Sequence, residues 1–143
     1  MISLREIDEN NWRAVVKLKV ADWQTPFVAS NGDSIARAHY VKDNFPLAIY
    51  DAEEPVGFCM YSISPKGEVW ILRLMIAADF QSEGRGKEAT SQLVSLLRRK
   101  FGATQIFISF NPENKWAMRL YESLGFKKDE REFEDEIIYR LDP

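Results

Sequence analysis

A short loop with two glycines, QSEGRGK at residues 81–87, has the composition of an anion-binding site. It follows an apolar run at residues 69–77 and precedes a run with helical periodicity. The first N–H groups of a helix have no partner inside the helix and carry the positive end of its dipole, so a helix start attracts anions. Gly84 and Gly86 leave the backbone accessible, and the flanking basic residues add positive charge. The loop suits a diphosphate, although the glycine spacing by itself is also typical of a plain strand-to-helix turn.

Two familiar nucleotide-binding motifs are excluded at this loop. The dinucleotide fingerprint needs a third glycine where this chain has Ala89, and it needs an acidic residue about twenty positions further on. That region reads QIFIS. The phosphate loop of NTPases needs a serine or threonine after its lysine, whereas GRGKEA has none.

A second stretch, NPENKWAMRLYESLGF at residues 111–126, places a polar set on one helical face. Asn114, Ala117 and Tyr121 stand at i, i+3 and i+7, which is one side of an α-helix. Tyr121 could supply a proton or a hydrogen bond from this face. Taken alone, it is better interpreted as a core aromatic that packs beside Leu120 and Leu124.

The pattern along the chain predicts the elements that must position these residues. Helical periodicity, strand-type alternation and turn residues give the following order. We expect a strand over 2–7, a helix over 11–23, a helix over 34–42 capped by Asp33 or Ser34, two strands within 46–63 joined at 53–55, a strand over 68–77, a helix over 87–101, a strand over 105–111, a helix over 114–125 and a hairpin over 126–142. This order predicts one α/β domain, residues 1–143, with a mixed sheet and a parallel strand–helix–strand unit at 69–111.

The composition narrows the class of protein. The chain has 143 residues, a formal net charge of −3 and a single cysteine and histidine, Cys59 and His39. These numbers exclude an internal disulfide and a site with several cysteine or histidine metal ligands. The charge gives no general attraction to nucleic acid or to an anionic membrane. With a charged N-terminus and no apolar run of membrane-span length, the sequence predicts a cytoplasmic protein, and it leaves a homodimer open.

Together, the two stretches are far more specific than either alone. Gln-x-x-Gly-x-Gly after a long strand, followed by Asn-x-x-Ala-x-x-x-Tyr-x-x-x-Gly-Phe, resembles the GNAT superfamily of acetyl-CoA-dependent N-acetyltransferases. The resemblance is strong over residues 46–126 and extends to the whole chain in element order. It implies a mixed α/β fold with a mostly antiparallel central sheet, a splayed parallel strand pair and flanking helices. It also implies acetyl-CoA as cosubstrate, and no metal.

The resemblance carries site residues over by position. The loop would bind the pyrophosphate, the preceding strand the pantetheine arm, two asparagines would flank the cofactor, and the helix tyrosine would be the acid. The pyrophosphate residues of the loop are Gln81, Ser82, Glu83, Gly84, Arg85, Gly86 and Lys87. The pantetheine residues of the strand are Leu74, Met75 and Ile76, the flanking asparagines are Asn111 and Asn114, and the acid is Tyr121.

The acceptor is suggested by a finer resemblance. DWQTPFVASNGDS at residues 22–34, and the central strand with Arg73, are similar to the bacterial spermine/spermidine acetyltransferases of this superfamily. The acidic run at residues 129–136 fits a polycationic acceptor. The alternatives are another amine (an aminoglycoside, an amino acid or a protein N-terminus) or a non-catalytic domain that binds acyl-CoA.

The chemistry requires a neutral amine, an oxyanion donor and a partner for the thiolate. Glu68, at the start of the central strand, is the first candidate for the base; residues of FVASN and of the acidic run are others. A backbone N–H near Met75, turned outward by a bulge, would meet the oxyanion. Proton transfer from Tyr121 to a thiolate is uphill by about 2 kcal/mol, so a hydrogen bond to sulfur is the minimum role. Cys59 and His39 are expected to be packing or surface residues.

Overall fold

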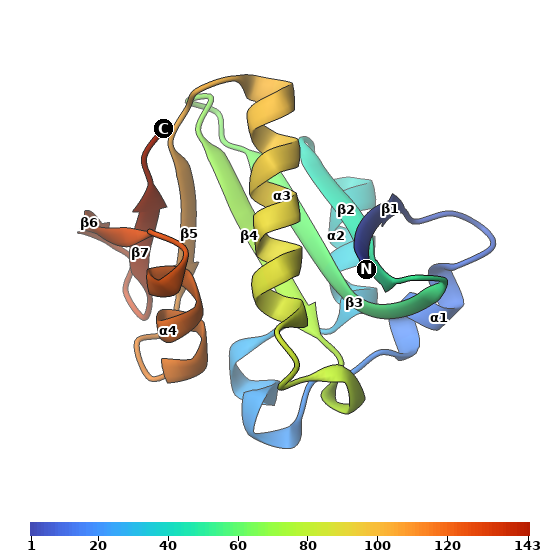
Figure 1. Ribbon diagram of the computed structural model, residues 1–143. Helices are drawn as coiled ribbons and strands as arrows, with labels where there is room; N and C mark the ends of the chain where they lie inside the picture. Colours follow the sequence, from blue (N-terminus) through green and yellow to red (C-terminus); the bar gives the residue numbers. More distant parts are fainter.

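The computed structural model describes residues 1–143 and is organised around a seven-stranded sheet (Figure 1). The strands are β1 Ile2–Glu6, β2 Asn44–Asp51, β3 Glu54–Ile63, β4 Val69–Ile76, β5 Ile106–Phe110, β6 Lys127–Glu132 and β7 Ile137–Leu141. The α-helices are α1 Trp12–Lys17, α2 Asn31–Tyr40, α3 Arg85–Phe101 and α4 Lys115–Ser123, and the 3-10 helices are η1 Asp22–Phe27 and η2 Ala78–Phe80. The strand order is β1-β2-β3-β4-β5-β7-β6.

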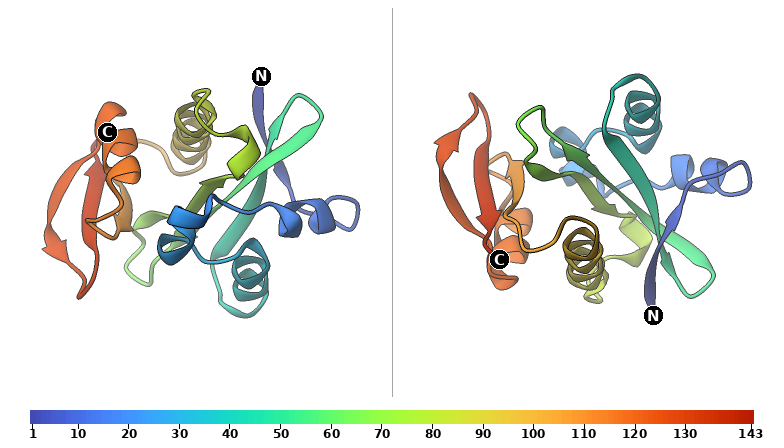
Figure 2. Two further views of the ribbon diagram at one scale, coloured as in Figure 1. Left: turned by 90° about the horizontal axis from the view of Figure 1, so that it is seen from below. Right: turned by 90° about the horizontal axis from the view of Figure 1, so that it is seen from above.

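Helices cover both faces of the sheet (Figure 2). On one face α3 and α4 bury a large apolar cluster, to which α3 contributes Leu93 and Leu97 and α4 contributes Ala117 and Tyr121. On the other face α1 and α2 close a smaller cluster that includes Val15. The sheet is buried on both sides through its centre, which explains why β3 and β4 read as nearly continuous apolar runs.

The sheet divides between its two parallel strands. β4 and β5 pair only at Val69–Ile106, Trp70–Phe107 and Ile71–Ile108, and all other neighbouring strands are antiparallel. Beyond the last of these pairs the strands diverge, and Figure 1 shows the gap widening toward α4. This confirms the expected mixed sheet with a splayed parallel pair around 69–111. It also leaves one edge of β4 without a strand partner.

A β-bulge marks the point of divergence. Met60 of β3 pairs with Arg73, whereas Tyr61 pairs with Ile71, so Leu72 is the extra residue in β4. The expectation of a bulge near Met75 is therefore wrong. Met75 lies in regular register, and the bulge falls three residues earlier, directly after the last pairing with β5. Because a bulge bends its strand and increases local twist, this position turns β4 away from β5.

Two predicted helix boundaries are corrected by contacts made elsewhere in the chain. The helix expected over 11–23 ends at Lys17, and a separate 3-10 helix follows. The side-chain amide of Asn31 donates to the carbonyl oxygens of Val15 and Leu18, at 2.9 and 3.2 Å, and thereby satisfies the open end of α1. The second helix is capped by Ser30, whose hydroxyl accepts the N–H of Asp33 at 3.1 Å, so neither expected cap residue is the cap.

The predicted terminal hairpin is present as β6 and β7, and a buried carboxylate holds it together. Asp129 is only 7% exposed and accepts hydrogen bonds from Arg131 Nε at 2.8 Å and Arg140 at 2.9 Å. Hydrogen bonding to Arg131, with a contribution from Arg140, holds the Asp129 pKa below its ordinary value. Asp129, though part of the acidic run, is therefore neutralised within the fold.

Replacing Asp129 by asparagine is expected to lower the free energy of unfolding by about 2 kcal/mol, since both guanidinium groups lose their buried carboxylate partner and keep only a more exposed one. Asp142→Asn is the matched control, because Asp142 makes an exposed pair with Arg140 and should cost under about 1 kcal/mol. Urea denaturation at pH 7 measures both values. Because the folded-state pKa of Asp129 lies below the unfolded value, the stability difference between the wild type and the variant should begin to shrink near pH ~4 and disappear only as the pH falls through the lowered pKa. Equal losses in the two variants would contradict a structural role for Asp129.

No helix combines the length and the apolar character that a bilayer crossing requires.

Candidate active site

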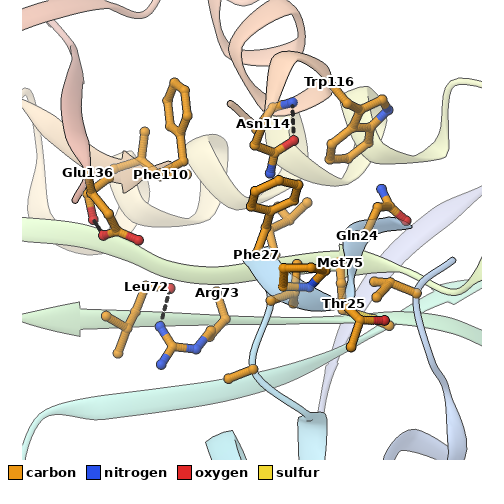
Figure 3. A pocket seen from close by; sticks show the side chains of 18 of the residues that line it. Gln24, Thr25, Phe27, Leu72, Arg73, Met75, Phe110, Asn114, Trp116 and Glu136 are labelled. Carbon is orange, nitrogen blue, oxygen red and sulfur yellow. Dashed lines mark hydrogen bonds between the residues drawn. The ribbon is translucent and has the colours of Figure 1, made fainter. Parts of the chain in front are cut away.

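A cavity of about 600 Å³ occupies the space between the diverging strands β4 and β5 (Figure 3). Its walls come from β4, the end of β5, α4 and the segment around η1. Leu74, Met75 and Ile76, the residues expected to hold pantetheine, all lie in the β4 wall. Because β5 has turned away, this wall offers backbone groups that no strand occupies, which is what an extended amide-containing arm can pair with.

The glycine loop has the geometry of an anion-binding helix start. Gly84 is the N-cap of α3 and has φ of 78°, a left-handed value that glycine adopts without strain. No backbone N–H of residues 82–87 donates to another group of the chain. A Cβ at Gly84 would have nothing within 4 Å, so the loop is open to solvent there. These free N–H groups fit a pyrophosphate.

The two basic side chains of the loop differ in whether their charge is available to a ligand. Arg85 Nε donates to Asp51 at 2.9 Å, and its guanidinium also pairs with Glu83 at 2.9 Å and donates to the carbonyl of Phe80 at 3.0 Å. Its charge is therefore already neutralised, and it offers an anion only its N–H group. Lys87 is exposed and makes no ion pair, so it remains the cation of the loop.

Gln81 joins the loop to the cavity. Its amide nitrogen donates to the carbonyl of Ile76 at 2.8 Å and to the side-chain oxygen of Gln24 at 2.7 Å. Gln24 is buried and also accepts the N–H of Ala21. The end of β4, the loop and η1 are thus fixed to one another, and Gln81 acts by positioning rather than by free contact with a phosphate.

Tyr121 lies in the cavity wall and is 3% exposed. Its ring packs between Phe110 and Phe126, with centroids 5.8 and 5.5 Å away, and its hydroxyl has no hydrogen-bond partner in the chain. Burial, with a smaller contribution from Cys59, raises the Tyr121 pKa well above its ordinary value. A phenol with a raised pKa is a poor proton donor, so the geometry favours a hydrogen bond to the sulfur over full transfer.

The two asparagines are separated by the fold. Asn114 caps α4 by accepting the N–H of Ala117 at 3.2 Å, and it lies in the cavity wall with Trp116 (Figure 3). A Cβ at Gly86 would lie 3.3 Å from the Trp116 ring, so the helix start and α4 touch across the cavity. Asn111 instead lies in a neighbouring groove of about 460 Å³.

We call that neighbour the acidic groove. Five of its nine lining residues are acidic, and none of the five makes an ion pair; three of them belong to the loop between β6 and β7. The full lining is Asn111, Pro112, Glu113, Glu132, Phe133, Glu134, Asp135, Glu136 and Ile137. Phe133 and Glu136 line the groove and the cavity alike, so the two spaces adjoin.

The first candidate for the base is not brought to the cavity. Glu68 makes an ion pair with Arg131 at 3.1 Å and is absent from the cavity wall. His39 packs edge-on against Tyr40 outside the cavity. Cys59 is fully buried, and burial raises its pKa to about 12, which makes it a packing residue as expected.

Several residues in the cavity wall were missed by sequence reasoning. Arg37 and Arg73 face the cavity without a carboxylate within ion-pair distance, and Glu136 and Ser109 meet at its far end. The Nε of Arg73 is buried without a partner, and burial, followed by the charge of Arg37, lowers the Arg73 pKa. Glu136 had a signal as a member of the acidic run, and Arg73 had one as part of the central strand that resembles the spermine/spermidine acetyltransferases. The others come from segments far apart in sequence.

Comparison with known proteins supplies the decisive observation. A profile of the acetyltransferase (GNAT) family matches residues 4–126. The chain belongs to the acetyltransferase (GNAT) family. It is an acetyl-CoA-dependent N-acetyltransferase, and its mixed sheet with splayed parallel strands is a GNAT fold.

Individual relatives agree with this membership. The spermine/spermidine N(1)-acetyltransferase of Bacillus subtilis (strain 168) is 28% identical over 136 residues, with 88% of each chain covered. The PaiA N-acetyltransferase of Thermoplasma acidophilum, solved with coenzyme A, has a TM-score of 0.75 and 15% identity over 100% of this chain and 99% of that one. An aminoglycoside acetyltransferase AAC(6')-Ib, also with coenzyme A, has a TM-score of 0.81 and 18% identity, with 98% and 93% covered.

Coenzyme A chemistry fits the residues of this GNAT chain. The structure assembles no group of three or more His, Cys, Asp or Glu side chains suited to a metal ion. It does provide unpaired loop amides for the pyrophosphate, an unpaired strand edge for the pantetheine amides and a buried hydroxyl in the cavity wall.

Proposed function

We propose that this N-acetyltransferase transfers the acetyl group of acetyl-CoA to a primary amine of a small cationic acceptor, with polyamines such as spermine and spermidine as the first candidates. The observation that carries the proposal is the junction of the cavity with the acidic groove. A polyamine is a flexible chain with several positive charges, and one amine in the cavity would leave the others near the unpaired carboxylates of the groove. The spermine/spermidine activity of the 28% identical relative points the same way.

In this proposal each part of the site has one task. When bound, acetyl-CoA supplies an activated acetyl carbon. The N–H groups of residues 82–87 and Lys87 hold the pyrophosphate, and Leu74, Met75 and Ile76 pair with the pantetheine arm. A backbone N–H at the bulge around Leu72 is the proposed oxyanion donor, since a bulge frees a group from the ladder. Tyr121 donates a hydrogen bond to the sulfur, and Asn114 borders the cofactor.

The test is thiol release from acetyl-CoA against a panel of amines that includes spermine, spermidine, a monoamine, an amino sugar and an amino acid. We expect the highest kcat/KM with a polyamine. Added salt should raise KM for spermine with little change in kcat, because exposed charges more than about 8 Å apart are largely screened at physiological ionic strength. A monoamine should show a much smaller salt dependence. Thiol release with a monoamine or amino sugar but not with spermine or spermidine would refute the polyamine acceptor and leave the acetyl transfer intact.

A second acceptor class is favoured by a separate observation. Arg37 and Arg73 line the cavity with no carboxylate of the chain to pair with them. Arg37 is exposed, but Arg73 is half-buried and its buried Nε has no partner, which is unfavourable and which a carboxylate on the acceptor would relieve. An amino acid or a protein N-terminus with an acidic neighbour would then be the acceptor. In the same panel this candidate predicts turnover of the amino acid and a loss of that turnover in Arg73→Gln.

A further inference from the structure

The cavity contains very few groups that can exchange a proton. Of the side chains that line it, only Arg37, Arg73, Tyr121 and Glu136 are titratable. Arginine stays protonated in proteins, and burial keeps the Tyr121 hydroxyl protonated as well. Glu136 is the only carboxylate in the cavity wall. A protonated amine that enters this space therefore meets one group that can accept its proton.

Glu136 is held at the closed end of the cavity, where the strands diverge. Its Oε1 accepts the hydroxyl proton of Ser109 at 2.8 Å. Ser109 directly follows Ile108, whose partner Ile71 is the last residue of β4 that pairs with β5, and the bulge at Leu72 comes next. Figure 3 shows Glu136 at the same end of the cavity as Leu72 and Arg73, with Gln24 and Thr25 at the opposite end. The carboxylate thus lies at the same end of the cavity as the candidate oxyanion donor.

We infer that Glu136 is the general base of this acetyltransferase, held in place by Ser109. The inference rests on the proposed transfer to a primary amine and holds for either acceptor class. An N–H bond of the acceptor ammonium breaks and its proton joins the Glu136 carboxylate, directly or through one water. The neutral nitrogen then forms the C–N bond as the carbonyl electron pair moves onto oxygen, giving a tetrahedral intermediate, and the C–S bond breaks when this intermediate collapses. The second proton of the nitrogen goes to the departing sulfur, and Glu136 returns its own proton to solvent.

The surroundings of Glu136 suit this cycle. Because Glu136 lines both the cavity and the acidic groove, it can receive a proton from one side and release it on the other. Glu68, the competing carboxylate, is neutralised by Arg131 and does not reach the cavity. The charged and titratable groups that share these two spaces with Glu136 are Arg37 of α2, Arg73 of β4, Tyr121 of α4, Glu113 before α4, and Glu132, Glu134 and Asp135 of the hairpin.

The test compares Glu136→Gln with Glu130→Gln across pH, with the amine that the wild type turns over best. Glu130 is an exposed carboxylate of the same hairpin and lies outside the cavity and the groove. Its variant therefore measures the effect on kcat of removing one nearby negative charge. At pH 7, E136Q is expected to lower kcat about 100-fold, which is within the usual range for a lost general base. The deficit should shrink as the pH approaches about 10, because the amine then arrives neutral. E130Q should keep kcat within about twofold.

Three further measurements separate catalysis from structure. Calorimetry should show unchanged CoA affinity in E136Q, and acceptor affinity in the presence of CoA should fall by far less than kcat. Glu136→Asp keeps a carboxylate and should retain the wild-type pH profile at a reduced rate, even if E136Q folds poorly. Ser109→Ala should lower kcat several-fold with the same pH profile as the wild type.

An E136Q enzyme with the wild-type kcat and pH profile, or an E136D enzyme with the pH profile of E136Q, overturns the assignment. Absence of thiol release by the wild type with every amine refutes the proposed function instead.

Discussion

Replacing Gly84 by aspartate is expected to weaken acetyl-CoA binding about 1000-fold. The residue caps α3 beside N–H groups that have no partner in the chain, and its Cβ would face open space. A carboxylate there would stand a few Å from the pyrophosphate, where like charges repel by about 1–4 kcal/mol depending on the effective dielectric constant. The positive end of the helix dipole would also be neutralised by the new side chain. Calorimetric titration with CoA measures the loss.

Gly84→Asn is the matched control. Asparagine has the same size as aspartate, and both tolerate the left-handed backbone with φ of 78° better than other residues with a Cβ. The two variants should therefore fold alike, which thermal unfolding checks, while the asparagine variant should bind CoA within about tenfold of the wild type. Gly86 is less suitable for this test, because a side chain there would also be in tight contact with the Trp116 ring. Equal CoA affinity in the two Gly84 variants would contradict an anion site at this loop.

Replacing Tyr121 by phenylalanine should lower kcat about 100- to 1000-fold, similar to the loss of one transition-state hydrogen-bond donor in other acyl transfers. The ring packing against Phe110 and Phe126 is retained, so stability and CoA affinity should change little. Tyr139→Phe is the matched control. Its ring is buried like that of Tyr121, but its hydroxyl donates to the exposed Glu122 at 2.8 Å and lies outside the cavity. That variant should lose about 1 kcal/mol of stability and keep kcat.

The pH dependence tests the form of the Tyr121 contribution. Burial raises the Tyr121 pKa, which means that the hydroxyl keeps its proton as the pH rises past the ordinary value of about 10. Wild-type kcat should therefore show no alkaline decline from Tyr121 between pH 7 and about 10. An alkaline limb that disappears in Tyr121→Phe would show that the phenol ionises in this range and acts as a true acid. A single-turnover rate equal to the wild type would make Tyr121 a packing residue only.

Local patterns in the sequence are sufficient to predict much of this fold. The strand, loop and helix around residues 69–101 follow from an apolar run, glycines at a backbone turn and helical periodicity, each of which acts within a few residues. The same holds for the face of α4 that carries Asn114 and Tyr121, because helix geometry alone puts them on one side. Family membership was also within reach, since these two stretches together carry the resemblance.

The tertiary structure decided what depends on residues far apart in the chain. The sequence indicates a free cation at Arg85, whereas in the structure its guanidinium donates a hydrogen bond to Asp51, 34 positions away. The end of α1 is determined by the hydrogen bond from the Asn31 side chain to the carbonyl of Val15. The hydrophobic periodicity of the helix does not predict this contact. The proposed base is Glu136 rather than Glu68, because the hairpin places Glu136 against Ser109, 27 positions away. Which strand edge is left open, and which carboxylate faces it, depends on the packing of β4, β5 and β7 against one another, and local sequence does not encode that packing.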